Sequence, residues 1–261
     1  MPDRTQLAEK AAALAALHVP GDPVVLPNAW DVTSARAFVK EGFPAIATSS
    51  SAVARSLGFQ DGEDTPPDEM FAAIARMTGA VDVPVTADIE RGYGLEPEEI
   101  VARLLDAGAV GCNLEDSHPP TGEAIAKDTQ AEWLGRVRAA ASSAGVDVVL
   151  NARVDVFLKE WGAPDERLAD AIARGTAYFE AGATCVYPFG LPSPSEIEEY
   201  VRAVNGPINA VFLPDGPPLS DLAAAGVARV TFGGGLHIAM QHLLRQAAAR
   251  IRAGGSPYEE L

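Results

Sequence analysis

Eight apolar runs, each separated from the next by a segment of helical pattern, extend along this chain of 261 residues. Several helical segments end in glycine just before the next run, as in DAGAV (106–110) and EAGAT (180–184), where glycine suits a left-handed helix cap. This repetition predicts an α/β fold, and about eight units in this length match a single parallel (β/α)8 TIM-type barrel. The runs cover residues 24–30, 45–50, 84–90, 110–116, 147–155, 184–190, 208–214 and 228–234.

A doubly wound open sheet is the alternative architecture for the same pattern. Such sheets usually carry a glycine-rich phosphate turn after the first strand, whereas the first run here continues into LPNAWD (26–31) without one. No linker or shift of composition divides the chain, so residues 1–261 are predicted to form one domain. The last helical segment, 237–254, is apolar on one face and is expected to close the barrel or to pack on a partner chain.

Charge and composition exclude several classes of partner. The formal net charge of -16 argues against nucleic acid and anionic membranes, because both select basic surfaces. A small carboxylate substrate stays compatible, since a bound divalent cation reverses the local field. Cys112 and Cys185 lie in apolar runs and form no disulfide or metal pattern. The charged, Ala-rich segment 1–18 is not typical of a signal or transit peptide, so a cytoplasmic protein is expected.

Acidic residues stand where two successive strands are predicted to end. Asp88 and Glu90 finish one run, and Glu115 and Asp116 finish the next. Side chains at the carboxyl ends of barrel strands converge on one pocket, and residues two apart share one side of a strand. Several oxygen ligands without a His or Cys cluster favour Mg²⁺ or Mn²⁺ over Zn²⁺. Asp116 precedes Ser-His-Pro-Pro, which favours a turn role for it.

Other strand ends offer groups that suit an anion. Arg153 lies inside the apolar strand LNARVD (150–155), so it needs an anion, either a substrate or a neighbouring acid such as Glu115. The Thr-Ser-Ser-Ser run at 48–51 forms either a backbone cradle for an oxyanion or an ordinary turn with a serine cap. Trp30 and Asn209 are further candidates for substrate contact. His237 and His242 are expected at the surface or an interface.

These residues resemble a known family. DVPVTADIERGYG (82–94), GCNLEDS (111–117) and LNARVDVF (150–157) are similar to the signature of the isocitrate lyase / phosphoenolpyruvate mutase superfamily. The segment 26–62 resembles the start of the same barrel. The resemblance implies a Mg²⁺-dependent barrel that makes or breaks C–C or P–C bonds of 2-oxo acids and their relatives. It also implies that the last helix is exchanged between subunits of a homodimer or homotetramer.

The resemblance also implies roles for single residues. Asp88 matches the acid that contacts the metal directly, and Glu90 and Glu115 match acids that hold it partly through water. Asp61 matches a loop aspartate that reaches the same site, and Arg153 matches the arginine that binds the substrate carboxylate or phosphonate. Catalytic roles are therefore expected for Asp61, Arg153 and Glu115. The turn that matches the backbone cradle for the 2-oxo acid is formed by Ser49, Ser50 and Ser51.

One loop departs from the family pattern. Isocitrate and methylisocitrate lyases carry a Lys-Lys-Cys-Gly-His loop after the fourth strand, and phosphoenolpyruvate mutases carry a longer one. Here that stretch is SHPPTGEAIAKDTQ (117–130), which has no cysteine. The leading hypothesis is a Mg²⁺-dependent C–C lyase of a small 2-hydroxy or 2-oxo di- or tricarboxylate. The alternatives are P–C chemistry on phosphonopyruvate and a 2-oxo-acid binding protein with little catalysis.

Overall fold

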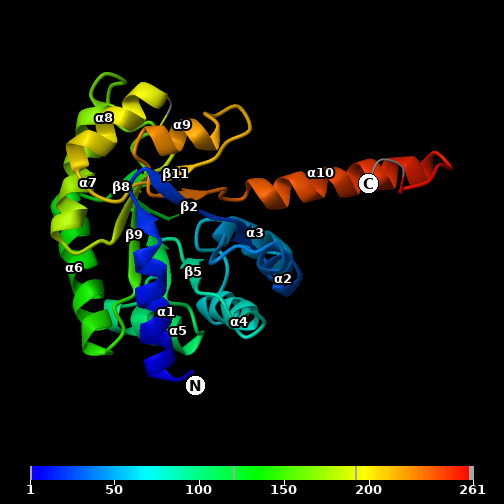
Figure 1. The fold of residues 1–261 in the computed structure, drawn as a ribbon, viewed down its shortest axis with the longest axis horizontal. Helices are drawn as coiled ribbons and strands as arrows, with labels where there is room; N and C mark the ends of the chain where they lie inside the picture. Colours follow the sequence, from blue (N-terminus) through cyan, green and yellow to red (C-terminus); the bar gives the residue numbers. More distant parts are fainter. Residues whose placement is uncertain (1, 120, 192, 259–261) are drawn as a thin grey trace.

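The computed structural model describes residues 2–119, 121–191 and 193–258. Strands and helices alternate along most of it, with the strands in the middle and helices outside them (Figure 1). The strands are β1 (His18–Val19), β2 (Asp22–Leu26), β3 (Asn28–Ala29), β4 (Ile46–Thr48), β5 (Val85–Asp88), β6 (Gly111–Leu114), β7 (Ser117–His118), β8 (Glu123–Ala124), β9 (Val149–Val154), β10 (Cys185–Pro188), β11 (Asn209–Val211) and β12 (Arg229–Thr231). The helices are α1 (Arg4–Ala16), α2 (Val32–Lys40), α3 (Ser50–Leu57), α4 (Pro67–Thr78), α5 (Pro97–Asp106), α6 (Lys127–Ser143), α7 (Arg167–Glu180), α8 (Pro194–Val204), α9 (Leu219–Ala224) and α10 (Gly235–Arg252).

The predicted parallel α/β architecture is confirmed. Six strands form one sheet in the order β10-β9-β6-β5-β4-β3, and every neighbouring pair in it is parallel. A second sheet has the order β1-β2-β12-β11, in which only the β1–β2 pair is antiparallel. The two sheets meet twice. β2 and β3 are separated only by Pro27, and a parallel bridge joins Val186 of β10 to Ile208 just before β11.

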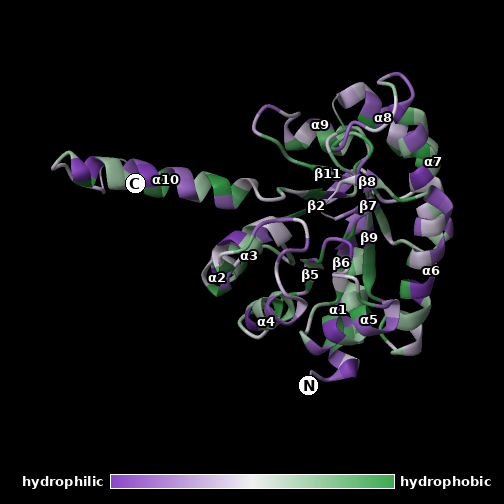
Figure 2. Cartoon of the chain, turned by 180° about the vertical axis from the view of Figure 1, so that it is seen from behind, coloured by the Kyte–Doolittle hydropathy of each residue, from purple (hydrophilic) through white to green (hydrophobic). Residues whose placement is uncertain are grey.

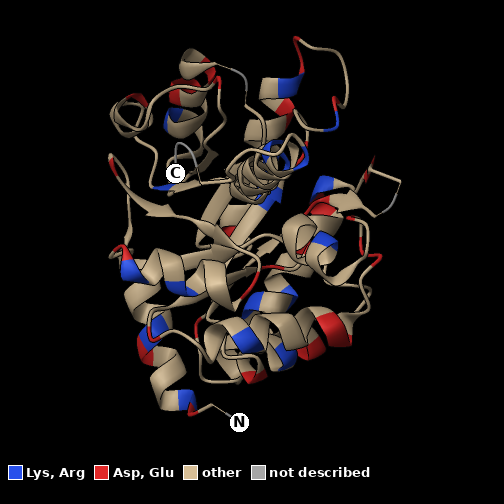
Figure 3. Ribbon diagram, turned by 90° about the vertical axis from the view of Figure 1, so that its right-hand side faces the viewer, with Lys and Arg blue, Asp and Glu red and all other residues tan. Residues whose placement is uncertain are grey.

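Apolar side chains cover both faces of the central strands, as a parallel sheet requires. The strands are hydrophobic, whereas the helices carry polar residues on their outer faces (Figure 2). Charged side chains lie mainly on these outer faces and in the loops (Figure 3). In α5, for example, Ile100, Val101, Leu104 and Leu105 are buried at helical spacing. The helix α1 packs at the amino end of β6, where Leu14 lies against Gly111.

Each of the eight apolar runs contains a strand, but the strands end earlier than the runs. β5 ends at Asp88 and β6 at Leu114, so Glu90 and Glu115 lie in the loops that follow. The expectation that Asp88 and Glu90 share one side of a strand is wrong, because Glu90 has left the extended conformation with a φ of 51°. The glycine caps were predicted correctly, since Gly108 and Gly182 have φ values of 81° and 100°.

The helix α10 projects away from the rest of the molecule (Figure 1). Its apolar side chains are open to solvent, with Ile238, Leu243 and Leu244 54%, 56% and 60% exposed. His237 departs from the expectation of a surface position, because its ring is buried against Trp30 at a centroid distance of 5.1 Å. Among the described residues, no helix is long and apolar enough to cross a membrane.

Candidate active site

A cavity of about 240 Å³ opens at the carboxyl ends of the strands. The loops after β4, β5, β6, β9, β10 and β12 build its walls. Every sequence-predicted site residue except Trp30 and Asn209 lines it. A cavity of about 340 Å³ near β11 is larger, but its lining is mostly apolar and holds a single acid, Asp215. The lining of the acidic cavity comprises Ser49, Ser50, Ser51, Asp61, Gly62, Asp88, Glu90, Glu115, Ser117, His118, Pro119, Gly122, Arg153, Leu158, Lys159, Phe189, Gly233 and Gly234.

Only one of the two carboxylate oxygens of Asp88 is hydrogen-bonded among the described residues. Its Oδ2 accepts hydrogen bonds from the backbone N–H of Ser50 at 3.1 Å and from the Ser50 hydroxyl at 2.9 Å. Its own N–H donates to the hydroxyl of Thr48 at 2.9 Å. Its Oδ1 is buried and has no hydrogen-bond partner among the described residues. A buried carboxylate oxygen without a partner is costly, so this atom is suited to bind a cation.

Glu90 connects the β5 loop to the loop after α3. Its Oε2 accepts from the backbone N–H groups of Gly62 and Glu63, each at 2.8 Å, and its Oε1 accepts from the Tyr93 hydroxyl at 3.1 Å. Burial, followed by the nearby charges of Asp61 and Asp88, raises the pKa of Glu90 to about 7. A cation at this place would offset the repulsion between the acids, which adds to the effect of burial on this pKa.

Arg153 lies between two acids. Its Nη1 is 2.5 Å from Oε1 of Glu115, and its Nε and Nη2 contact the two oxygens of Asp155 at 2.6 and 3.0 Å. The guanidinium also lies 5.4 Å from the ring centre of Phe189. Burial raises the pKa of Glu115 well above its ordinary value, although Arg153 opposes the shift. The ion pair with Glu115, one of the two interpretations left open by the sequence, is therefore present.

Asp61 reaches the cavity from an exposed part of the loop after α3. Glu63 fixes this loop, because its Oε1 accepts from the backbone N–H groups of Arg91 and Tyr93 at 3.1 and 2.6 Å. Partial loss of hydration, followed by repulsion from Asp88, raises the pKa of Asp61. The acids at the cavity therefore repel one another, which is expected of a site that takes a cation.

The donor set fits a hard divalent ion that keeps some of its water. Among the described residues, no three His, Cys, Asp or Glu side chains are arranged to hold a metal by themselves. Oδ1 of Asp88 is the free buried acid oxygen, whereas Glu90 and Glu115 already have protein partners. Mg²⁺ is usually bound by one or two carboxylates, several waters and substrate oxygens. The all-oxygen lining and the free Asp88 atom fit Mg²⁺ or Mn²⁺ in this manner.

The serines of the turn at 49–51 have different roles. Ser49 caps α3, because its hydroxyl accepts from the N–H of Ala52 at 3.4 Å, so the serine-cap interpretation holds for this residue. Ser50 binds Asp88 with both of its donors and does not offer them to a substrate. Ser51 lines the cavity, and its hydroxyl lies 3.2 Å from that of Ser49.

Two predicted substrate contacts lie away from the cavity. Trp30 is 8% exposed and packs on His237 at the start of α10. Asn209 is fully buried at the start of β11, where its Oδ1 accepts from the Thr231 hydroxyl at 3.2 Å. Trp30 stands in the loop after β3, and Asn209 begins its strand rather than ending it. Asn209 therefore does not stand at a strand end, and Trp30 does but turns to His237 instead of the cavity.

Asp155 stands at the end of the fifth apolar run, but no role of its own was predicted for it, and Lys159 was not singled out at all. The spacing of two between Arg153 and Asp155 is a signal for their pairing, because alternate residues of a strand share one side. Lys159 gave no comparable signal, since its place depends on how the loop after β9 folds. Asp116 has the structural role that was favoured, with its Oδ2 accepting from the Tyr178 hydroxyl at 2.8 Å and Arg174 Nη1 at 3.0 Å.

The fold and the cavity place this protein among parallel α/β proteins whose sites are built from loops at strand carboxyl ends. Within that class, the chain belongs to the phosphoenolpyruvate phosphomutase family, whose family model matches residues 14–252.

Similar proteins carry several names. An uncharacterized protein of Mycobacterium tuberculosis strain H37Rv is 34% identical over 255 residues, which are 94% of this chain and 93% of that protein. A probable 2-methylisocitrate lyase 2 of Corynebacterium glutamicum is 29% identical, covering 77% and 66% of the two chains. The phosphoenolpyruvate phosphomutase of Streptomyces hygroscopicus is 28% identical, covering 93% and 80%. The crystal structure of a proposed phosphonomutase from Burkholderia cenocepacia J2315 has a TM-score of 0.88 and 40% identity, covering 92% and 99%. Relatives in this superfamily are thus lyases and mutases.

Proposed function

We propose that the chain is a Mg²⁺- or Mn²⁺-dependent lyase that cleaves a C–C bond of a small 2-hydroxy or 2-oxo di- or tricarboxylate through an enolate. This activity is of the methylisocitrate lyase, dimethylmalate lyase or oxaloacetate decarboxylase type. The proposal depends above all on Oδ1 of Asp88, a buried acid oxygen without a partner among the described residues. It lies in a cavity that also holds Glu90, Glu115 and Asp61.

The four acids would bind the cation in two ways. Asp88 would bind the cation directly, and Glu90, Glu115 and Asp61 would hold it through water. When bound, the cation would polarise the 2-oxo group and stabilise the enolate that forms as the bond breaks. Arg153 keeps Glu115 oriented, and the N–H groups that Glu115 and Asp155 leave free can donate to a substrate carboxylate.

Turnover tests this proposal. Methylisocitrate, dimethylmalate and oxaloacetate should be incubated with the chain and Mg²⁺, with an EDTA-treated sample as the control. We expect loss of at least one substrate that stops on chelation and in Asp88→Ala. Lack of any Mg²⁺-dependent turnover would contradict the proposal. Mg²⁺-dependent binding of oxalate or 2-oxoglutarate without turnover would instead identify a 2-oxo-acid binding protein.

P–C chemistry is the second candidate. Two similar proteins, the Streptomyces phosphomutase and the proposed Burkholderia phosphonomutase, have names that favour it. The cavity would then hold phosphonopyruvate, with the same acids around the cation. Phosphorus NMR of phosphonopyruvate incubated with the chain and Mg²⁺ distinguishes the two candidates. A new phosphate or phosphoenolpyruvate signal would assign P–C chemistry and overturn the lyase assignment.

The architecture supports two further parts of the proposal. Because β12 pairs with β2 and a bridge links β10 to the residue before β11, we infer that the two sheets form one closed (β/α)8 barrel and a single domain. The projecting α10 leaves its apolar side chains open to solvent. We infer that α10 is exchanged with a second copy, which gives a homodimer or a homotetramer.

A further inference from the structure

Lys159 provides an uncompensated positive charge at the rim of the acidic cavity. It lines the cavity together with His118, Pro119 and Gly122 of the β7–β8 hairpin. Among the described residues, Lys159 has no hydrogen bond or ion pair through its side chain. An ammonium group is stabilised by a nearby anion, and among the described residues no carboxylate lies within ion-pair distance of this one.

The backbone holds Lys159 firmly at this place. Its N–H donates to the carbonyl of Asp155 at 2.8 Å, and the N–H of Trp161 donates to Val156 at 3.0 Å, which closes a tight turn. The indole Nε1 of Trp161 donates to the carbonyl of Gly122 at 3.0 Å and so joins this turn to the hairpin. A Cβ on Gly122 would lie 3.4 Å from Nζ of Lys159, which places the ammonium group over the hairpin.

Arg153 cannot supply the missing positive charge. Its guanidinium already faces the carboxylates of Glu115 and Asp155, so its charge is compensated within the protein. The cavity lining therefore presents two unlike groups. The free Oδ1 of Asp88 and the other acids suit a cation, whereas the unpaired ammonium of Lys159, near Gly122 of the hairpin, suits an anion. A ligand that matches both carries a cation-binding group and a separate anionic group.

We propose that Lys159 binds the distal carboxylate of a dicarboxylate whose 2-oxo acid end lies at Asp88. This inference rests on the proposed function and assigns the residue that recognises the second carboxylate of its substrate. One unpaired lysine balances the single charge of a carboxylate. A phosphonate would bring up to two charges and, among the described cavity residues, would find no second unpaired lysine or arginine. Lys159 thus selects diacids over monoacids of the same length.

Binding of matched ligands tests the inference. Oxaloacetate and 2-oxobutyrate have the same chain length and differ in a terminal carboxylate against a methyl group, and oxalate occupies only the metal end. Their affinities in Mg²⁺ should be measured by calorimetry for the parent, Lys159→Met and Lys159→Arg. We expect Lys159→Met to lower the affinity for oxaloacetate about tenfold, because one charge-assisted hydrogen bond is lost. The affinity for 2-oxobutyrate should fall less than about twofold. Lys159→Arg should keep most of the preference. If oxaloacetate turns over, its KM replaces the calorimetric value.

Arg55→Met is the control for a general loss of positive charge. Nη1 of Arg55 would lie 3.7 Å from a Cβ on Gly234, and Arg55 is not part of the cavity lining. Its substitution should therefore leave the ratio of the two affinities unchanged. An equal ratio in Lys159→Met and the parent, with oxalate still bound, would overturn the inference and leave the proposed function intact. Tighter binding of phosphonopyruvate than of oxaloacetate would overturn the choice of a carboxylate. Failure of oxalate to bind the parent would contradict the proposed function itself.

Discussion

Ser50 binds one oxygen of Asp88 twice, through its backbone N–H and its hydroxyl, and the other oxygen of Asp88 is left without a partner among the described residues. This relationship orients the carboxylate before any cation arrives. Ser50 is thus a positioning residue for the proposed metal site.

Loss of the Ser50 hydroxyl should weaken cation binding. In Ser50→Ala the backbone N–H still holds Asp88, but the carboxylate can turn. We expect Mn²⁺ affinity to fall on the order of tenfold, as for other groups that orient a ligand. Calorimetric titration with Mn²⁺ measures this change. Ser56→Ala is the control, because within the described part of the chain its hydroxyl donates only to the carbonyl of Ala52 on the same helix. Equal Mn²⁺ affinities in both variants would contradict this role of Ser50.

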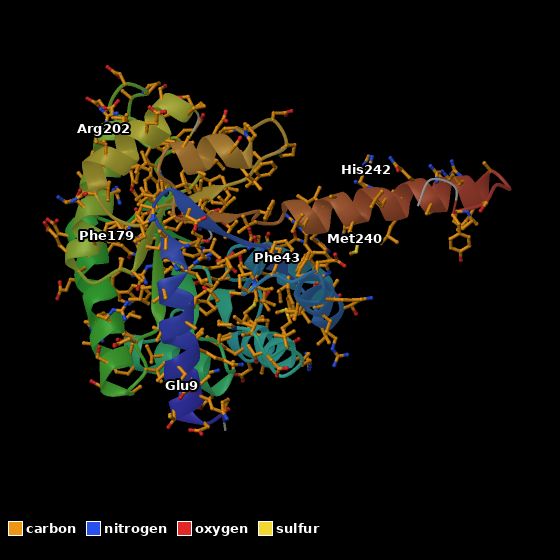
Figure 4. All side chains as sticks on the ribbon, viewed as in Figure 1. Glu9, Phe43, Phe179, Arg202, Met240 and His242 are labelled. Carbon is orange, nitrogen blue, oxygen red and sulfur yellow. The ribbon has the colours of Figure 1, made fainter. Side chains whose placement is uncertain are left out.

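A buried ion pair outside the cavity should contribute to stability. Arg174 of α7 binds Asp116, which is fully buried and also accepts the Asp155 N–H at 2.9 Å. Arg174→Met would leave Asp116 buried without its cation, so the free energy of unfolding should fall by about 3 kcal/mol. Urea denaturation measures it. Arg202→Met on the exposed surface of α8 should change stability by less than about 0.5 kcal/mol. Arg202 is labelled in Figure 4.

The fold was predictable because it depends on local patterns. Each of the eight apolar runs contains a strand, and glycines end the helices where expected. The site was predictable in membership but not in geometry. Glu90 is held by Gly62 and Glu63, which lie 28 and 27 residues away in the sequence. Such contacts depend on how two loops pack, and the periodicity of the sequence does not predict that packing.

Asn209 and Lys159 also show that the sequence pattern does not predict which side chains reach the cavity. Asn209 was expected at the end of the seventh strand, yet it is the second residue of the apolar run 208–214 and the first residue of β11. Its side chain is fully buried and accepts a hydrogen bond from the Thr231 hydroxyl. Lys159 is the opposite case. It belongs to no strand and no motif, and only the turn between Asp155 and Trp161 brings it to the cavity.

The exposed face of α10 should join two copies of the chain. Met240 and Leu244 are 36% and 60% exposed and lie on one face at a spacing of four. His242 lies on another side of the helix (Figure 4). We expect Leu244→Asp to shift the sedimentation profile toward monomer, because it places a charge in the proposed interface. His242→Asp adds the same charge elsewhere and should keep the oligomer. A monomeric parent protein would contradict the exchange of α10.

The contribution of His18 to stability should fall between neutral and mildly acidic pH, because His18 is buried in its neutral form. Its Nδ1 lies 2.8 Å from the carbonyl of Leu14, and its Nε2 has no partner among the described residues. Burial, followed by the charge of Arg229, lowers the pKa of His18 to about 4. In the unfolded chain this pKa is close to 6.5. Below pH 6.5 the unfolded chain therefore binds a proton that the native protein does not take up until about pH 4.

The contribution of His18 to the free energy of unfolding should thus be constant above pH 6.5 and decrease as the pH falls toward 4. The whole loss is about 3 kcal/mol, and about 2 kcal/mol of it occurs by pH 5. Urea denaturation at pH 7 and pH 5, at one protein concentration, measures the difference. His18→Gln should remove this part of the pH dependence, whereas His242→Gln, at an exposed site, should keep it. An equal pH dependence in His18→Gln and the parent would show that His18 becomes protonated in the native state.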